Sequence, residues 1–176
     1  MMKSGPLLAG AIALAGIMLA GGAGAPALAA PADVALLQTF VGNWSGRGEI
    51  VGSDRHSVRC RMTLSSGNQG KVNYHGTCTL GGAQLSVAGT IAYIEAQQRY
   101  EAAMTTNASF TGVAIGQKRG NGLVFNLRER ETDDAGTELS IAAQIVLRPD
   151  AINVVFDVMD IATGDSLRAE VPFDKT

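Results

Sequence analysis

Residues 36–50 read LLQTFVGNWSGRGEI and contain Trp44, the single tryptophan of the chain. The apolar residues before Gly42 follow a helical period, whereas polar residues occupy every second position from Asn43 to Glu49, as in a β-strand. The segment therefore predicts a short helix that leads directly into a first strand. We expect Trp44 to plug one end of a closed β-structure.

From Asn43 onward the chain consists of short segments in which apolar residues recur at every second position, separated by turn residues such as glycine, asparagine, aspartate and proline. This rhythm is typical of consecutive antiparallel strands. The first expected strand begins at Asn43, and the others span 55–64, 71–80, 84–94, 98–105, 110–118, 123–131, 138–147, 152–159 and 166–173. The single helix expected before them spans 33–40, with Asp33 as its N-cap.

Most of these strands have one apolar and one polar face, so the sheet must fold over itself to bury the apolar face. Closing ten sequential strands also removes the exposed sheet edges. The sequence therefore predicts an all-β fold, a ten-stranded antiparallel up-and-down β-barrel with a short N-terminal helix. A two-sheet β-sandwich is the alternative, and the inward face of 110–117 stays undecided.

The two cysteines, Cys60 and Cys78, lie on apolar strand faces on either side of a turn-rich segment at 65–70. If Leu64 faces Tyr74 across this turn, Cys60 falls directly opposite Cys78. The Cα atoms of such a non-hydrogen-bonded pair lie about 4.5 Å apart, within reach of a disulfide. The spacing predicts a structural disulfide that contributes about 3 kcal/mol to stability.

The first 29 residues have the features of a signal peptide. Lys3 supplies a positive charge, an apolar run covers 6–20, and residues 27–29 form an A-x-A cleavage site. An uncleaved membrane anchor is the alternative, but the apolar run is short and no basic residue follows it closely. We therefore predict cleavage after Ala29 and export to an oxidising compartment.

Cleavage leaves residues 30–176, the size of one domain. Lys3 leaves with the signal, so 13 basic residues face 16 acidic ones and the net charge becomes −3. Such an acidic domain does not have the charge expected for binding nucleic acid or an anionic membrane surface. We expect a monomer that does not insert stably into a membrane.

The motif Gly42-x-Trp44-x-Gly46-x-Gly48 resembles the opening of nitrobindin-like and fatty-acid-binding-like ten-stranded barrels, members of the lipocalin–calycin superfamily. The chain also resembles small exported proteins of Gram-negative bacteria without assigned chemistry, which implies the periplasm or secretion. The resemblance implies a barrel interior that either packs solid or holds one small apolar molecule.

Nitrobindin-like members bind haem through a histidine late in the chain. Here no histidine follows His75, so haem held by His56 is only an alternative. Two histidines and two paired cysteines cannot build a zinc site. The chain also lacks the G-x-S-x-G elbow of serine hydrolases. We therefore expect neither a metal nor an enzyme.

The candidate ligand-binding residues are the aromatic and sulfur-containing side chains expected to point inward. They are Trp44, Met62, Tyr74, Tyr93, Tyr100, Met104, Phe125 and Phe156. The three tyrosine hydroxyls would be the few polar anchors that apolar pockets use, and plain core packing is the other interpretation. The acidic residues at 129–134 are assigned to a solvated hairpin. The expected function is binding of a small apolar molecule; the alternative is an envelope interaction protein or protease inhibitor with a filled barrel.

Overall fold

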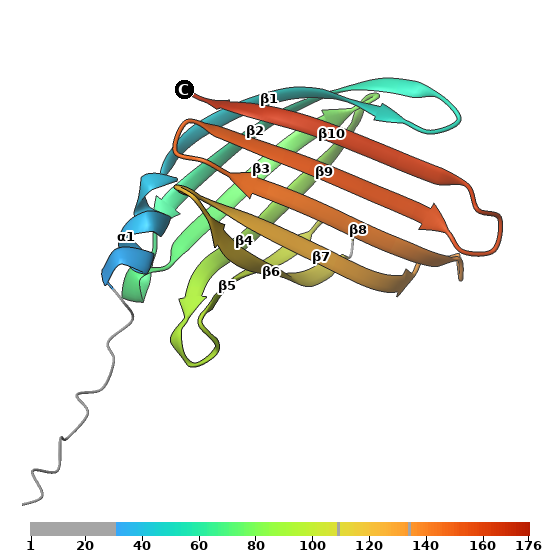
Figure 1. Cartoon of the computed structure of the whole chain (residues 1–176). Coiled ribbons are helices and arrows are strands. Elements are labelled where there is room, and N and C mark those ends of the chain that lie inside the picture. Colours follow the sequence, from blue (N-terminus) through green and yellow to red (C-terminus); the bar gives the residue numbers. More distant parts are fainter. Residues whose placement is uncertain (1–30, 109, 134) are drawn as a thin grey trace, which may run out of the picture.

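The computed structural model describes residues 31–108, 110–133 and 135–176, and within them one helix precedes a closed barrel of ten antiparallel strands (Figure 1). The elements are α1 (Pro31–Thr39), β1 (Gly42–Val51), β2 (Arg55–Ser66), β3 (Val72–Leu80), β4 (Ala83–Ile94), β5 (Arg99–Thr106), β6 (Thr111–Arg119), β7 (Gly122–Thr132), β8 (Glu138–Leu147), β9 (Ala151–Asp160) and β10 (Ser166–Lys175). The predicted barrel is confirmed, and the sandwich alternative is wrong. The predicted signal peptide and its cleavage site lie outside the described residues.

Each strand pairs with its neighbours in sequence, and β1 closes the barrel by pairing with β10. In this seam Gly46 lies opposite Phe173, and Glu49 lies opposite Glu170. Closure leaves no strand with a free edge, as the alternating pattern requires. Among the described residues, no helix has the length and apolar character needed to span a membrane.

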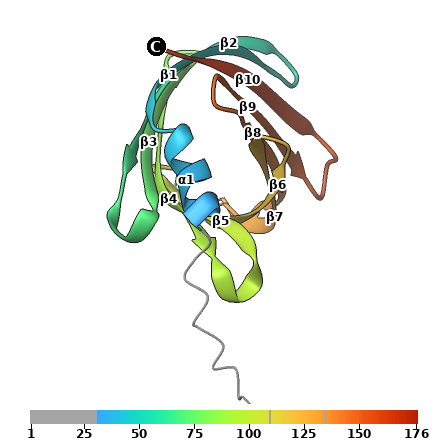
Figure 2. The ribbon, with the colours of Figure 1, turned by 60° about the vertical axis from the view of Figure 1, so that its left-hand side comes forward.

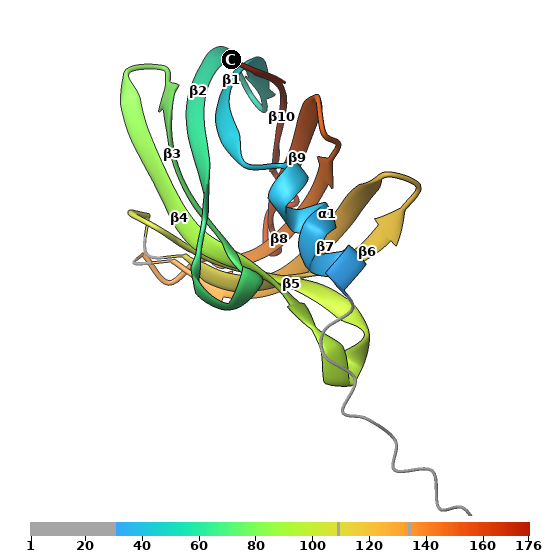
Figure 3. The same cartoon turned by 90° about the vertical axis from the view of Figure 1, so that its left-hand side faces the viewer.

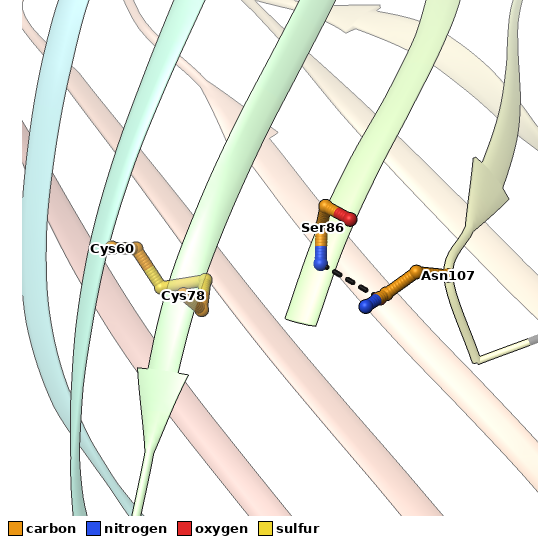
Figure 4. Close-up of a disulfide and its surroundings, with 4 residues drawn as sticks. All are labelled: Cys60, Cys78, Ser86 and Asn107. Atoms are coloured by element: carbon orange, nitrogen blue, oxygen red, sulfur yellow. Dashed lines mark hydrogen bonds between the residues drawn. A yellow bond between two sulfur atoms is a disulfide. The ribbon is translucent and has the colours of Figure 1, made fainter. Parts of the chain in front are cut away.

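The hairpin predicted from the cysteine spacing is confirmed in its register. Leu64 pairs with Tyr74 and Cys60 pairs with Cys78, whose Cα atoms are 4.0 Å apart. The disulfide joins β2 to β3, while on the neighbouring β4 the Ser86 amide donates a hydrogen bond to Asn107 Oδ1 (Figure 4). Both features hold consecutive strands together on the same side of the barrel.

Helix α1 lies across one end of the ring of strands (Figure 2). The side chains of Leu37 and Phe40 are completely buried there, above Trp44, which is 1% exposed. The indole N–H of Trp44 donates a hydrogen bond to the Phe40 carbonyl oxygen at 3.1 Å. Trp44 and α1 therefore seal this end of the barrel together.

Asp33 does not cap α1 as predicted. The helix begins two residues earlier, so Asp33 lies in its first turn, where its carboxylate accepts a 2.7 Å hydrogen bond from the Tyr100 hydroxyl of β5. At the other end of the helix, Lys175 Nζ donates to the Thr39 carbonyl oxygen. These two bonds connect α1 to opposite parts of the barrel wall.

Candidate ligand-binding lumen

The two ends of the barrel interior differ in how tightly they are packed. Near α1 several inward side chains are at most 2% exposed, among them Trp44, Tyr100, Leu123 and Phe125. The other end carries the β1–β2, β3–β4, β5–β6, β7–β8 and β9–β10 turns (Figures 1 and 3). Leu167, which faces inward there, is 38% exposed. We call this end the mouth and the space inside the barrel the lumen.

Many inward-facing apolar side chains of the barrel remain only half-buried, although others, such as Val58 and Leu127, are buried. Cross-strand pairing shows their direction, because Ile145 lies opposite both Phe125 and Val154, and Phe156 lies opposite Ala143. The half-buried inward set comprises Ile50, Met62, Leu80, Leu85, Val87, Met104, Leu139, Ile145, Val154, Phe156 and Val158. Since a solidly packed interior would bury these side chains, their exposure indicates that water enters the lumen through the mouth.

Glycines keep several aromatic rings against the wall of the barrel. A Cβ atom on Gly89 would lie 2.5 Å from the Tyr74 hydroxyl oxygen, and a Cβ atom on Gly46 would lie 2.8 Å from the Phe173 ring. A Cβ on Gly116 would collide with the ring of Phe125 in the same way. Each ring therefore lies over a glycine of the adjacent strand. The rings cover the wall without extending across the lumen.

The strand whose inward face was undecided, β6, presents only small residues to the interior over positions 111–117. Gly112, Ala114 and Gly116 are buried, whereas Val113 points outward and is 45% exposed. The bulk that fills this side comes from Phe125 of β7, which pairs with Gly116. The inward set of β6 thus adds almost no volume to the lumen.

The tyrosine hydroxyls predicted as ligand anchors are largely engaged within the protein. Tyr74 donates to the Ala103 carbonyl oxygen at 3.0 Å, and Tyr100 donates to Asp33. Burial raises the pKa of both tyrosines well above the ordinary range, and for Tyr100 the hydrogen bond to Asp33 adds to this effect. The Tyr93 ring packs against Tyr100 with centroids 5.0 Å apart, and its hydroxyl has no hydrogen bond to another described residue.

The eight predicted site residues therefore fall into two groups. Those in the sealed end beneath α1 are Trp44, Tyr100 and Phe125. Those that are half-buried are Met62, Tyr74, Tyr93, Met104 and Phe156. Within the second group, Met62 lies opposite Trp44 and Tyr93 lies beside Tyr100, both next to the sealed end. The structure brings the other three to the wall of the lumen, where they could contact a ligand.

Two polar residues that face the lumen were not among the predicted site residues. The expected strand 123–131 already contained Glu129 and Glu131, but their charges were interpreted as part of a solvated hairpin. Strand β7 carries both on its inward face. They pair with Ile141 and Leu139 of β8, and both are half-buried. The signal was present in the sequence, because both glutamates continue the alternation of the inward residues before them.

The histidines do not place a haem ligand inside the lumen. His56 pairs with Ile50 at the mouth and is exposed, whereas His75 pairs with Thr63 and is exposed on the outer wall. A haem held by His56 would lie at the rim, not among the half-buried apolar side chains. The described residues also contain no group of three or more histidine, cysteine, aspartate or glutamate side chains arranged to hold a metal ion.

Two hollows on the outer wall are separate from the lumen. One of about 410 Å³ lies over β3 to β6 and is lined mainly by outward-facing residues such as Ala88, Ala103 and Val113. Another of about 450 Å³ lies over β1 and β2, beside Arg47 and Arg61. Both are open to solvent.

No protein-family model matches the chain, and no curated protein matches it significantly. Among solved structures, the crystal structure of Rv2717c from M. tuberculosis is similar, with a TM-score of 0.64, 11% identity, and coverage of 80% of this chain and 97% of that one. A de novo designed fluorescence-activating β-barrel covers 80% of this chain and 96% of its own at 15% identity, with a TM-score of 0.42. At 11% identity, the first likeness supports the barrel fold alone.

Proposed function

We propose that this protein is an exported, monomeric barrel of the lipocalin–calycin kind that binds a small apolar molecule in its lumen. The observation that supports this proposal most directly is the half-buried apolar middle of the barrel, where Ile145, Val154 and Phe156 face inward but keep contact with water. An apolar ligand would displace that water and complete the burial of these side chains.

The expected affinity follows from the area that a ligand would bury. Each methylene group moved from water into an apolar site contributes about 0.8 kcal/mol. A ligand with roughly ten methylene groups would therefore gain about 8 kcal/mol before the entropy lost on association is subtracted. Dissociation constants of about 1 μM or weaker are the expected range.

The proposal is tested by introducing a bulky side chain at an inward-facing position of β9 and, as a control, at its outward-facing neighbour. Val154 and Val155 are neighbours on β9, but Val154 faces Ile145 inside the barrel and Val155 pairs with Gln144 on the outer face. We expect Val154→Trp to abolish binding of decanol and of a neutral solvatochromic dye, because the indole ring occupies the lumen. Val155→Trp adds the same ring outside and should leave binding unchanged.

Binding is measured by dye fluorescence and by the gain in melting temperature that a ligand of the native state produces. Equal binding by both variants, or no binding by the wild type, would refute the proposal. Stable complex formation with a protease in the absence of dye binding would favour the alternative of an envelope inhibitor with a filled barrel. Native mass spectrometry of protein purified from its own cell envelope would reveal the ligand that accompanies it.

A further inference from the structure

We infer that the ligand of the lumen is a single-chain amphiphile with a protonated amine head, bound with its tail toward α1 and its head at the mouth. This inference rests on the proposed function and deepens it, because the apolar lumen supplies the binding site and its polar residues select the head group.

In the deep part of the lumen, the Tyr93 hydroxyl is the one tyrosine hydroxyl without a hydrogen bond among the described residues, and it lies beside Tyr100 at the sealed end. The hydroxyls of Tyr74 and Tyr100 are bonded within the protein, and the surrounding inward side chains are apolar. Burying a polar head there without a hydrogen-bond partner would be unfavourable. The head of an amphiphile must therefore remain near the mouth, while its tail replaces water along the apolar wall.

At the mouth several inward polar groups are already engaged. Asp160 Oδ1 accepts hydrogen bonds from the amides of Ala162 and Thr163, and the hydroxyl oxygen of Thr106 accepts from the amides of Ala108 and Phe110. These groups stabilise their own turns, which leaves them poorly placed to bind a ligand.

Glu129 and Glu131 differ from these engaged groups. They are half-buried, and neither carboxylate has a hydrogen bond or an ion pair within the described part of the chain. The two arginines of the same strand, Arg128 and Arg130, occupy the alternate positions and are exposed on the outer face. The inward face of β7 therefore presents two carboxylates without a neutralising cation.

The position of these carboxylates sets the length and charge of the ligand. Glu129 lies four residues from Phe125, which belongs to the sealed end, so about 13 Å of apolar wall separates them along the strand. This length accommodates a medium-length alkyl tail. Partial removal of the carboxylates from water strengthens their attraction for a cation, which favours an ammonium head over a neutral or anionic one. His56, the remaining inward ionisable group at the mouth, is exposed on β2, five strands away around the wall.

The test compares three probes that share one tail: dodecylamine, dodecanol and dodecanoate, each used below its aggregation concentration at neutral pH. We expect dodecylamine to bind at least about tenfold tighter than dodecanol, which corresponds to about 1.4 kcal/mol, and dodecanoate to bind more weakly than dodecanol. In the double variant Glu129→Gln and Glu131→Gln, the amine should lose this advantage while dodecanol affinity is retained.

Glu138→Gln is the matched control, because Glu138 pairs with Thr132 at the same rim but is exposed. It removes the same charge and should preserve the preference for the amine. Retained dodecanol binding also shows that each variant is folded. Equal binding of amine and alcohol by the wild type would overturn this inference while leaving the proposed function intact. A loss of preference in Glu138→Gln as large as in the double variant would also overturn it, and failure of all three probes to bind would refute the proposed function itself.

Discussion

Removing the Tyr100 hydroxyl should loosen α1 from the barrel. Tyr100 is 2% exposed, and its hydroxyl donates a 2.7 Å hydrogen bond to the Asp33 carboxylate, which connects the first turn of α1 to β5. We expect Tyr100→Phe to lower the free energy of unfolding, because the aromatic packing remains while this single bond is lost.

The size of the effect follows from the charge and the surroundings of the acceptor. Hydrogen bonds to charged groups contribute about 1.5–3 kcal/mol. Asp33 is half-buried, so its carboxylate can regain a water molecule after the substitution, which places the expected loss near 1.5 kcal/mol. For a domain of this size, that loss lowers the melting temperature by about 3–6 °C.

The assay is urea unfolding followed by circular dichroism, with Tyr93→Phe as the control. Tyr93 packs against Tyr100, but its hydroxyl has no hydrogen bond to another described residue, so the change should stay within about 0.5 kcal/mol. A double-mutant cycle with Asp33→Ala isolates the interaction between the two residues. Equal losses for the two tyrosine variants, or additive effects of Tyr100→Phe and Asp33→Ala, would refute this reasoning.

Three further predictions concern the disulfide, the seam and alkaline pH. The Cys60–Cys78 disulfide joins residues 18 positions apart in sequence. Its reduction should lower the free energy of unfolding by about 3 kcal/mol, measured by comparing unfolding with and without reductant. Gly48→Ala should destabilise by about 1–3 kcal/mol or more, because the new Cβ would collide with the Glu170 carbonyl oxygen across the β1–β10 seam. Burial raises the pKa of Tyr100, so the native state keeps the hydroxyl proton to a higher pH than the unfolded state does. The free energy of unfolding should therefore fall as the pH rises above about 10. Tyr100→Phe should reduce this dependence of stability on pH.

Each of these predictions has a distinct contrary outcome. Unfolding that is insensitive to reductant would contradict the contribution of the disulfide. For the seam, Gly52→Ala is the comparison, since its Cβ would approach nothing closer than 3.3 Å; equal losses for Gly48→Ala and Gly52→Ala would show that the close approach is unimportant. An alkaline stability profile unchanged by Tyr100→Phe would contradict the role of that hydroxyl.

The alternation of apolar and polar residues was sufficient to predict the barrel fold and the pairing register of β2 with β3. The pairing of Cys60 with Cys78 followed from the period-2 pattern and the length of the turn, because a shift of one residue would have turned every apolar side chain to the outside. The bounds of the strands were predicted less well. For example, β2 extends to Ser66, beyond the expected end at 64, because Ser65 and Ser66 were assigned to the turn.

The candidate site was harder to predict for two physical reasons. On β6, glycine and alanine point inward while Val113 and Ile115 point outward, so hydrophobicity did not reveal the orientation. At the mouth, Glu129 and Glu131 continue the inward row of the expected strand 123–131, but their charges favoured the interpretation of a solvated hairpin. The partners of the tyrosine hydroxyls depend on tertiary contacts that lie up to 67 residues away in sequence.

The pairing of β1 with β10 also governs when this protein can fold. Because Gly46 must meet Phe173, the wall cannot close until more than one hundred intervening residues are available, and joining ends so far apart carries an entropic penalty of about 4 kcal/mol. Until then the incomplete sheet has two free strand edges that could associate with other molecules. Losing the last strand would leave β1 and β9 with free edges, so we expect such a fragment to aggregate instead of forming a smaller barrel.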